Sequence, residues 1–392
     1  MSNLLDKAVI VGIGATEFSK NSGRSELQLA QEAALAACRD AGVNPHDVDG
    51  MVTYSMDTNP AIEVARGLGC KELNFFSHVD YGGGAAAGTI LHAAMAVATG
   101  VAKTVVCYRA FNERSGARFG TAMNVDGWAP DARAAAYSWT LPFGLMTPAS
   151  WVGMFAQRYM HLSGATSEDF GRVAVADRKH AATNPKAWFY GKPITLAEHQ
   201  ASRWIAEPLH LLDCCQESDG GQAFVITTPE RARDLPGAAV TIRSAAQGAA
   251  YDQHSMVSYY RADGDRALPE MGNVARQLWN DTGLRPEDID TAVLYDHFTP
   301  FVLAQLEEFG FCGRGEAKEF IKDGAIELGG RLPINPHGGQ LGEAYIHGMN
   351  GIAEGVRQVR GTAVNQVPDA RNVLVTAGTG VPTSALILGN DQ

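Results

Sequence analysis

The sequence has no run of about 18 apolar residues, the length that a membrane-spanning helix needs. Its start, residues 1–8, is too polar for a signal peptide. The six cysteines form neither a CxxC pair nor the Cys/His spacing of a zinc site. Positive charge is scarce, and a net charge of −11 argues against a general nucleic-acid or membrane-surface binder. We therefore expect a reduced, cytoplasmic protein with no metal site, no nucleic-acid partner and no membrane association.

What the chain does have is an alternation of strands and helices. With 392 residues, 45% of them hydrophobic, it is long enough for several domain-sized units. Apolar runs and amphipathic spacing predict a strand, a helix, a second strand, a glycine- and alanine-rich turn into a long helix, and a third strand. These lie at residues 7–18, 27–41, 47–54, 82–98 and 103–108. Such an order is typical of parallel βαβ units with helices covering a sheet.

The second part of the chain repeats this pattern. Residues 42–54 align with residues 283–295 at a constant offset of 241, with Gly, Pro, two Asp, Val and Tyr matching. Residues 239–248 open the second copy as residues 8–15 open the first. A loop and helix at 335–360 and a strand at 372–377 complete it. The repeat indicates a duplicated α/β unit.

Between the two copies lies a long segment of different composition, which carries five of the six tryptophans. A structureless insertion of this length is uncommon in a compact domain, so we expect a helical cap over the active face. We predict three parts: a first half at 1–110 completed by 213–245, a cap at 111–212, and a second half at 246–392.

The densest group of reactive side chains is in the glycine-rich loop 335–351. It carries His337, Glu343, Tyr345 and His347, all of which exchange protons or hydrogen bonds. A glycine-rich loop running into a helix N-terminus offers backbone N–H groups to an anion or a developing enolate. The alternative is a tight structural connection whose histidines are exposed to solvent.

The loop resembles the thiolase superfamily in its Asn335-x-x-Gly338-Gly339 start and in its later glycines. Pro-x-Asn-Pro-x-Gly-Gly and the preceding Gly-Phe-Cys-Gly-Arg-Gly-Glu at 310–316 look like the sterol-carrier-protein branch. The resemblance covers essentially the whole chain. It implies an α/β, thiolase-like five-layered αβαβα fold built from the duplicated unit, with the helical cap inserted.

The departures from that pattern concern the catalytic residues. The nucleophilic cysteine that thiolases need falls on Gly83, and there is no cysteine between 71 and 106. The activating histidine falls on Tyr345, and the residue that holds the thioester oxygen falls on Tyr295. The second catalytic cysteine falls on Thr376 or Ala377. Thiolysis by the usual route is therefore not expected.

Two tyrosines and an enolate-stabilising loop without a nucleophile fit retro-aldol cleavage of a β-hydroxyacyl-CoA. One group removes the β-hydroxyl proton, the Cα–Cβ bond breaks, and the enolate is stabilised and protonated. We predict Tyr295 and Tyr345 as the catalytic pair, with their two roles unassigned. The remaining candidates are His297, His337 and His347 for proton relay or tyrosine orientation, and Gly83, Gly338, Gly339, Asp296, Glu343 and Gly380 for substrate binding.

The combination Tyr-Asp-His-Phe at 295–298 and Gly-Glu-Ala-Tyr-Ile-His-Gly at 342–348 resembles the lipid-transfer-protein-type aldolases of steroid side-chain degradation. The resemblance implies a 17-hydroxy steroid substrate with a three-carbon CoA side chain, cleaved to a 17-keto steroid and propionyl-CoA. CoA is then part of the substrate, and no cofactor is expected. The family also implies a homodimer and a small partner with an OB-fold and a zinc ribbon. Two alternatives stay open: a thiolase-like acyltransferase with a nonstandard nucleophile, and a non-catalytic lipid or acyl-CoA carrier.

Overall fold

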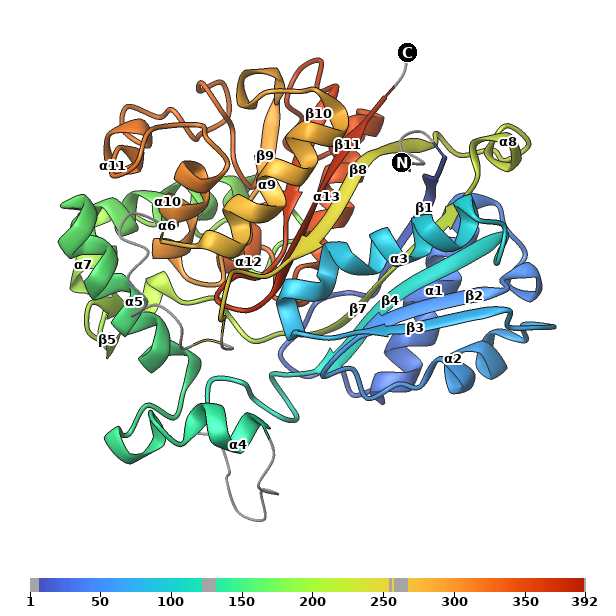
Figure 1. Ribbon diagram of the computed structural model, residues 1–392, viewed down its shortest axis with the longest axis horizontal. Coiled ribbons are helices and arrows are strands. Elements are labelled where there is room, and N and C mark those ends of the chain that lie inside the picture. The colour runs from blue at the N-terminus through green and yellow to red at the C-terminus, as the bar shows by residue number, and fades with distance from the viewer. Residues whose placement is uncertain (1–6, 122–131, 254–255, 257–266, 391–392) are drawn as a thin grey trace.

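The computed structural model describes residues 7–121, 132–253, 256 and 267–390, and nine strands in these residues form one large mixed sheet (Figure 1). The strands are β1 (Val9–Ala15), β2 (Gly50–Tyr54), β3 (Phe75–Val79), β4 (Thr104–Asn112), β7 (Asp219–Thr227), β8 (Val240–Gly248), β9 (Thr291–Val293), β10 (Asn372–Thr376) and β11 (Thr383–Gly389). Their order across the sheet is β3-β2-β4-β7-β1-β8-β11-β10-β9. Parallel pairs such as β2 with β4 lie beside antiparallel pairs such as β4 with β7.

The two halves of this sheet have the same topology. Across the first half-sheet the strands lie in the order β3-β2-β4-β7-β1. Counted along that half of the chain, these are its third, second, fourth, fifth and first strands. In the second half, β9, β10, β11 and β8 follow the same order, and Ile334 bridges Ala292 in the place of a third strand. The opening strands of the halves, β1 and β8, pair with each other antiparallel. The repeated order confirms the duplicated unit that the sequence predicts.

Helices form three layers around the two half-sheets, and the remaining helices lie in the cap and in loops. The helices are α1 (Glu26–Ala41), α2 (Ala61–Leu68), α3 (Ala86–Ala98), α4 (Ala132–Tyr137), α5 (Pro148–Ser163), α6 (Ser167–Thr183), α7 (Leu196–Ala201), α8 (Pro229–Ala232), α9 (Pro269–Thr282), α10 (Thr299–Glu308), α11 (Ala317–Phe320), α12 (Gly339–Gly342) and α13 (Met349–Arg360). α3 and α13 contact strands of both halves and each other, so they form the middle layer. α1 and α2 cover the outer face of the first half, and α9 and α10 that of the second. The result is the expected αβαβα arrangement.

Three apolar clusters fill the spaces between these layers. The middle cluster joins α3 and α13 to the facing sides of both half-sheets, with Ile90 and Ile352 at 0% and 1% exposure. A second lies between α1 and the first half, and a third packs α9, α10 and the cap against the second half. Burying one such large side chain contributes about 1.5–3 kcal/mol. The layers are therefore held by their apolar faces, and the loops at the strand ends are left to carry chemistry.

The segment between the halves forms a mostly helical cap. It contains α4 to α7 and a small two-stranded sheet of β5 (Trp204–Ala206) and β6 (Leu209–His210). α6 packs on α12 and α10, which places the cap over the glycine-rich loop. Of the predicted part boundaries, 245/246 falls inside β8, which pairs with β11 and β1. Among the described residues no helix combines the length and the apolar character that crossing a membrane would require.

Candidate active site

The two predicted catalytic tyrosines meet in the structure. Tyr295 follows β9, and Tyr345 lies in the loop between α12 and α13. Their hydroxyl oxygens are 3.1 Å apart, and the side chains are buried, with 2% and 7% exposure. Burial raises the pKa of both phenols well above the ordinary value. The pair is therefore neutral at physiological pH.

A hydrogen-bonded side-chain pair fixes the backbone of Tyr295. The amide of Tyr295 donates to Thr376 Oγ1 at 2.8 Å, and that hydroxyl donates to Gln305 Oε1 at 2.6 Å. Gln305 Nε2 donates in turn to the Tyr295 carbonyl at 2.9 Å. All three residues are buried. Thr376, which with Ala377 is one of the two positions on which the resemblance places the second thiolase cysteine, thus supports the tyrosine through its hydroxyl.

Gly83 lies directly in front of the Tyr295 hydroxyl. It is in the turn Gly82–Ala85 that leads into α3. A Cβ on Gly83 would be 2.2 Å from Tyr295 Oη and 3.0 Å from His347 Cδ2. No side chain fits there while Tyr295 holds its position. The tyrosine hydroxyl thus occupies the place of a side chain at Gly83, the position on which the resemblance places the thiolase nucleophile.

The three candidate histidines differ in their positions. The His347 ring centroid is 5.5 Å from that of Tyr345, and the His297 ring packs edge-on against Tyr295 at 4.7 Å. Burial lowers the pKa of His297 to about 3, and burial followed by Arg109 lowers that of His347 well below the ordinary range. Both rings are therefore neutral. His337 is also buried, but it lies beside Glu343: its Nε2 is 3.9 Å from Glu343 Oε2.

The other predicted binding residues support the loop from the cap side. A Cβ on Gly339 would be 2.1 Å from the Asp296 carboxylate, and one on Gly338 would contact α6 of the cap. The Asp296 carboxylate accepts from two backbone amides of α12, and Glu343 accepts from two buried asparagine side chains. The Gly380 amide donates to the buried carboxylate of Glu270 in the first turn of α9. Their role in substrate binding stays a prediction.

The structure adds site residues that the sequence reasoning missed. Arg109 in β4 is fully buried, and its Nη2 is 3.0 Å from His347 Nδ1. Glu113, one residue beyond the end of β4, is 2% exposed, and its Oε2 has no hydrogen-bond partner among the described residues. Burial, reinforced by Glu217, raises the pKa of Glu113 well above the ordinary value. The sequence offered two signals for these residues. Arg109 is a charged residue inside an apolar strand, and Glu113 is a charged residue at the carboxyl end of that strand.

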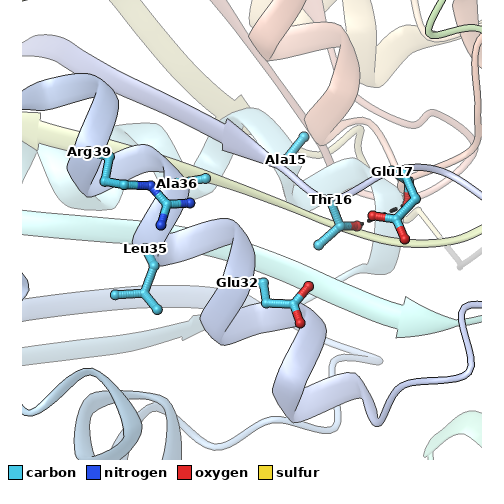
Figure 2. A pocket seen from close by; sticks show the side chains of 7 residues that line it. All are labelled: Ala15, Thr16, Glu17, Glu32, Leu35, Ala36 and Arg39. Carbon is cyan, nitrogen blue, oxygen red and sulfur yellow. Dashed lines mark hydrogen bonds between the residues drawn. The ribbon is translucent and has the colours of Figure 1, made fainter.

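A surface hollow near the N-terminal half is unrelated to this chemistry. It lies between the end of β1 and α1 and is lined by Thr16, Glu17, Glu32 and Arg39, among other residues (Figure 2). Neither tyrosine of the pair lines it. The candidate active site is instead the enclosed group around Gly83, Tyr295, Tyr345 and His347.

Comparison with known proteins shows to which family this chain belongs. A steroid side-chain-cleaving aldolase of Thermomonospora curvata is 69% identical over 100% of both chains. The chain belongs to the steroid side-chain-cleaving aldolases of the thiolase superfamily. The 17-hydroxy-3-oxo-4-pregnene-20-carboxyl-CoA lyase of Mycobacterium tuberculosis is 68% identical, over 98% of this chain and 100% of its own.

Structural comparison supports the same family. The solved Ltp2-ChsH2(DUF35) aldolase superposes with a TM-score of 0.95 at 68% identity, covering 100% of both chains. Residues 250–390 match the family described as Thiolase C-terminal domain-like. The predicted fold and the prediction of a carbon–carbon lyase are confirmed. The aldolase family membership also agrees with a site that has a glycine, Gly83, at the position where the resemblance places the nucleophilic cysteine of thiolases.

Proposed function

We propose that the chain cleaves a 17-hydroxy steroid carrying a three-carbon CoA side chain into a 17-keto steroid and propionyl-CoA. The observation that carries the proposal is the buried Tyr295–Tyr345 pair, 3.1 Å between hydroxyls, directly behind Gly83. The substrate class follows from the activity for which the 68% identical 17-hydroxy-3-oxo-4-pregnene-20-carboxyl-CoA lyase is named. CoA enters as part of the substrate and not as a separate cofactor.

Neutral tyrosines suit a proton relay better than a resting phenolate. One tyrosine oxygen accepts the β-hydroxyl proton while its own proton passes to the second tyrosine, 3.1 Å away. As the substrate O–H is lost, a C=O bond forms and the Cα–Cβ bond breaks, leaving its electron pair on the thioester enolate. In the same step the second tyrosine gives its own hydroxyl proton to Cα, and the proton that it receives from the first tyrosine replaces it. One proton moves from oxygen to carbon, and no ion forms on either phenol, which burial disfavours.

The test measures both products from one substrate. The protein, alone and with its partner present, is incubated with 17-hydroxy-3-oxo-4-pregnene-20-carboxyl-CoA, and propionyl-CoA and the 17-ketone are quantified by mass spectrometry. Tyr295→Phe and Tyr345→Phe each remove one relay oxygen, so we expect kcat to fall by about 10²–10⁴-fold for either variant, because positioned proton transfer contributes that much. Wild-type rates in both variants would remove the tyrosines from the mechanism.

The same incubation separates the two alternative functions. A thiolase-like acyltransferase predicts acyl exchange between an acyl-CoA and labelled free CoA, with no ketone formed. A non-catalytic carrier predicts binding of the steroid-CoA without either product. The geometry favours the lyase, since the position of the nucleophile is filled by the Tyr295 hydroxyl.

We also propose a homodimer and a small partner protein with an OB-fold and a zinc ribbon. The partner is suggested by the assembly with ChsH2(DUF35) in the 68% identical solved aldolase. For the homodimer, β3 is an end strand of the sheet, and Phe76 on it is 70% exposed. An unpaired strand edge beside exposed aromatic surface is a common pairing surface. Light scattering of wild type and Phe76→Glu checks it: the variant is expected to dissociate to monomer.

A further inference from the structure

The ring of His347 is held by a buried arginine, and this contact fixes its tautomer. Arg109 Nη2 is 3.0 Å from His347 Nδ1, and Arg109 is 0% exposed. A guanidinium has five N–H donors and no acceptor, and it stays protonated in proteins. Nδ1 of His347 therefore accepts the hydrogen bond. The imidazole is neutral, and its own hydrogen is on Nε2.

The surroundings of this pair keep it in place. The buried Asp57 carboxylate lies 3.6 Å from Arg109 Nη1 and balances the guanidinium charge. Arg109 also lies over the rings of Tyr54 and Phe111, at 4.8 and 4.5 Å. The Tyr54 hydroxyl donates to the His347 carbonyl at 2.7 Å, and His347 has a φ of 53°, a region that residues other than glycine rarely adopt. Ring and backbone are thus both fixed, at a cost in backbone strain that is typical of functional positions.

The Nε2–Cδ2 edge of the imidazole faces the glycine turn beside the tyrosine pair. A Cβ on Gly82 would lie 3.6 Å from His347 Nε2, and one on Gly83 would lie 3.0 Å from its Cδ2. The same point on Gly83 is 2.2 Å from Tyr295 Oη. Nε2–H therefore lies at the junction of the glycine turn and the tyrosines, where the thioester must come if the tyrosines act on Cα and the β-hydroxyl.

We propose that His347 Nε2–H donates a hydrogen bond to the thioester carbonyl oxygen as the enolate forms, and that Arg109 is the positioning residue that fixes this donor. The proposal rests on the retro-aldol function proposed above. When Cα–Cβ breaks, its electron pair moves into the enolate, and negative charge builds on the thioester oxygen. His347 keeps its proton throughout, and only its hydrogen bond strengthens. The proton that reaches Cα comes from the tyrosine relay.

Three features suit His347 to this task. A pre-oriented donor in a water-poor site stabilises a developing oxyanion without reorganising during the reaction. The guanidinium on Nδ1 polarises the ring and makes Nε2–H a stronger donor. The same positive charge, after burial itself, opposes protonation of the ring, since both lower the pKa of His347. The histidine therefore acts as a neutral donor and not as a general acid or base.

The first experiment measures the tautomer directly. Ring ¹⁵N spectra of the full-length protein labelled at histidine are recorded at pH 7, and the His347 signals are identified by their absence in His347→Gln. We expect a protonated Nε2 and an unprotonated Nδ1. In Arg109→Met the ring should show a mixture of tautomers or a protonated ring, and Arg109→Lys, which keeps a cationic donor, should restore the wild-type pattern. An Nδ1–H tautomer in wild type would overturn the proposal, whatever the Arg109 variants show.

The second experiment measures propionyl-CoA release. His347→Phe and Arg109→Met should lower kcat by about 10²-fold with a smaller effect on KM, the typical result of losing one oxyanion donor. His347→Gln, which keeps an N–H donor, should lose less. Arg360→Met is the matched control: Arg360 is also nearly buried and bonds Asp40, but lies at the far end of α13. Wild-type kcat in folded His347→Phe would overturn the proposal. Absence of product from wild type, with the expected tautomer, would instead overturn the proposed function.

Discussion

Adding one methyl group at Gly83 tests whether the missing side chain there makes room for the catalytic tyrosine. In Gly83→Ala the new Cβ would lie 2.2 Å from Tyr295 Oη and 2.9 Å from Cζ. Restoring an ordinary contact of 3.4 Å moves the phenol by about 1 Å, which breaks its 3.1 Å contact with Tyr345. Overpacking of this kind costs about 1–3 kcal/mol of stability. A misplacement of about 1 Å lowers a rate by about 10²-fold, which we expect for kcat.

The assay combines urea unfolding with the rate of propionyl-CoA release. The deciding comparison is a double-mutant cycle with Tyr295→Phe, which removes the nearest clashing atom. The stability cost of Gly83→Ala should be smaller in that background by at least about 0.5 kcal/mol, as for residues in direct contact. Gly153→Ala in α5 is the control, because its Cβ would have ordinary contacts of 3.4 Å or more. Full additivity in the cycle, or a wild-type kcat in Gly83→Ala, would refute the reasoning.

Three further predictions concern the supports of the site. Thr376→Val leaves the buried amide of Tyr295 without its acceptor, so it should cost about 1–3 kcal/mol in urea unfolding and lower kcat; Thr376→Ser should do neither. Asp177→Asn should stabilise the protein increasingly as pH rises from 4 to 8, since burial and Asp296 raise the pKa of Asp177 and its ionised form is disfavoured in the fold. Burial lowers the pKa of His337 to about 4 in the folded protein. As the pH falls below the ordinary pKa of histidine, the imidazole of His337 is therefore protonated in the unfolded chain before it is protonated in the folded one. The free energy of unfolding should therefore drop by about 1.6 kcal/mol between pH 6.5 and 5 on account of this residue, and this part of the drop should be absent in His337→Phe.

Contrary outcomes are simple to recognise in each case. A Thr376→Val protein with wild-type stability would mean that water replaces the lost acceptor. An Asp177→Asn protein that is less stable than wild type at pH 8 would mean that the aspartate is ionised and well paired. An unchanged pH slope in His337→Phe would mean that this imidazole is already accessible to protons in the folded state.

Much of the architecture follows from local and repeated features of the sequence. Apolar runs and helical spacing place β1, α1, α3 and α13 within a few residues of their observed bounds, because strand and helix periods are properties of contiguous segments. The constant offset of 241 predicts two equal halves, and the strand order repeats accordingly. Tyr295 and Tyr345 were identified through the family pattern, 50 positions apart, and the structure brings their hydroxyls together.

The sequence by itself therefore determined the duplication, which is encoded in spacing along the chain, and its resemblance to the thiolase superfamily indicated the layers and the tyrosine pair. Only the tertiary structure decided why Gly83 must be glycine and which groups surround the pair. Tyr295 reaches Gly83 across 212 residues, and Arg109 reaches His347 across 238. Contacts between strand ends of different halves depend on how the layers pack, and no local pattern records them. Arg109 is informative in the sequence only as a charge in an apolar strand; its role is defined by the histidine that it meets.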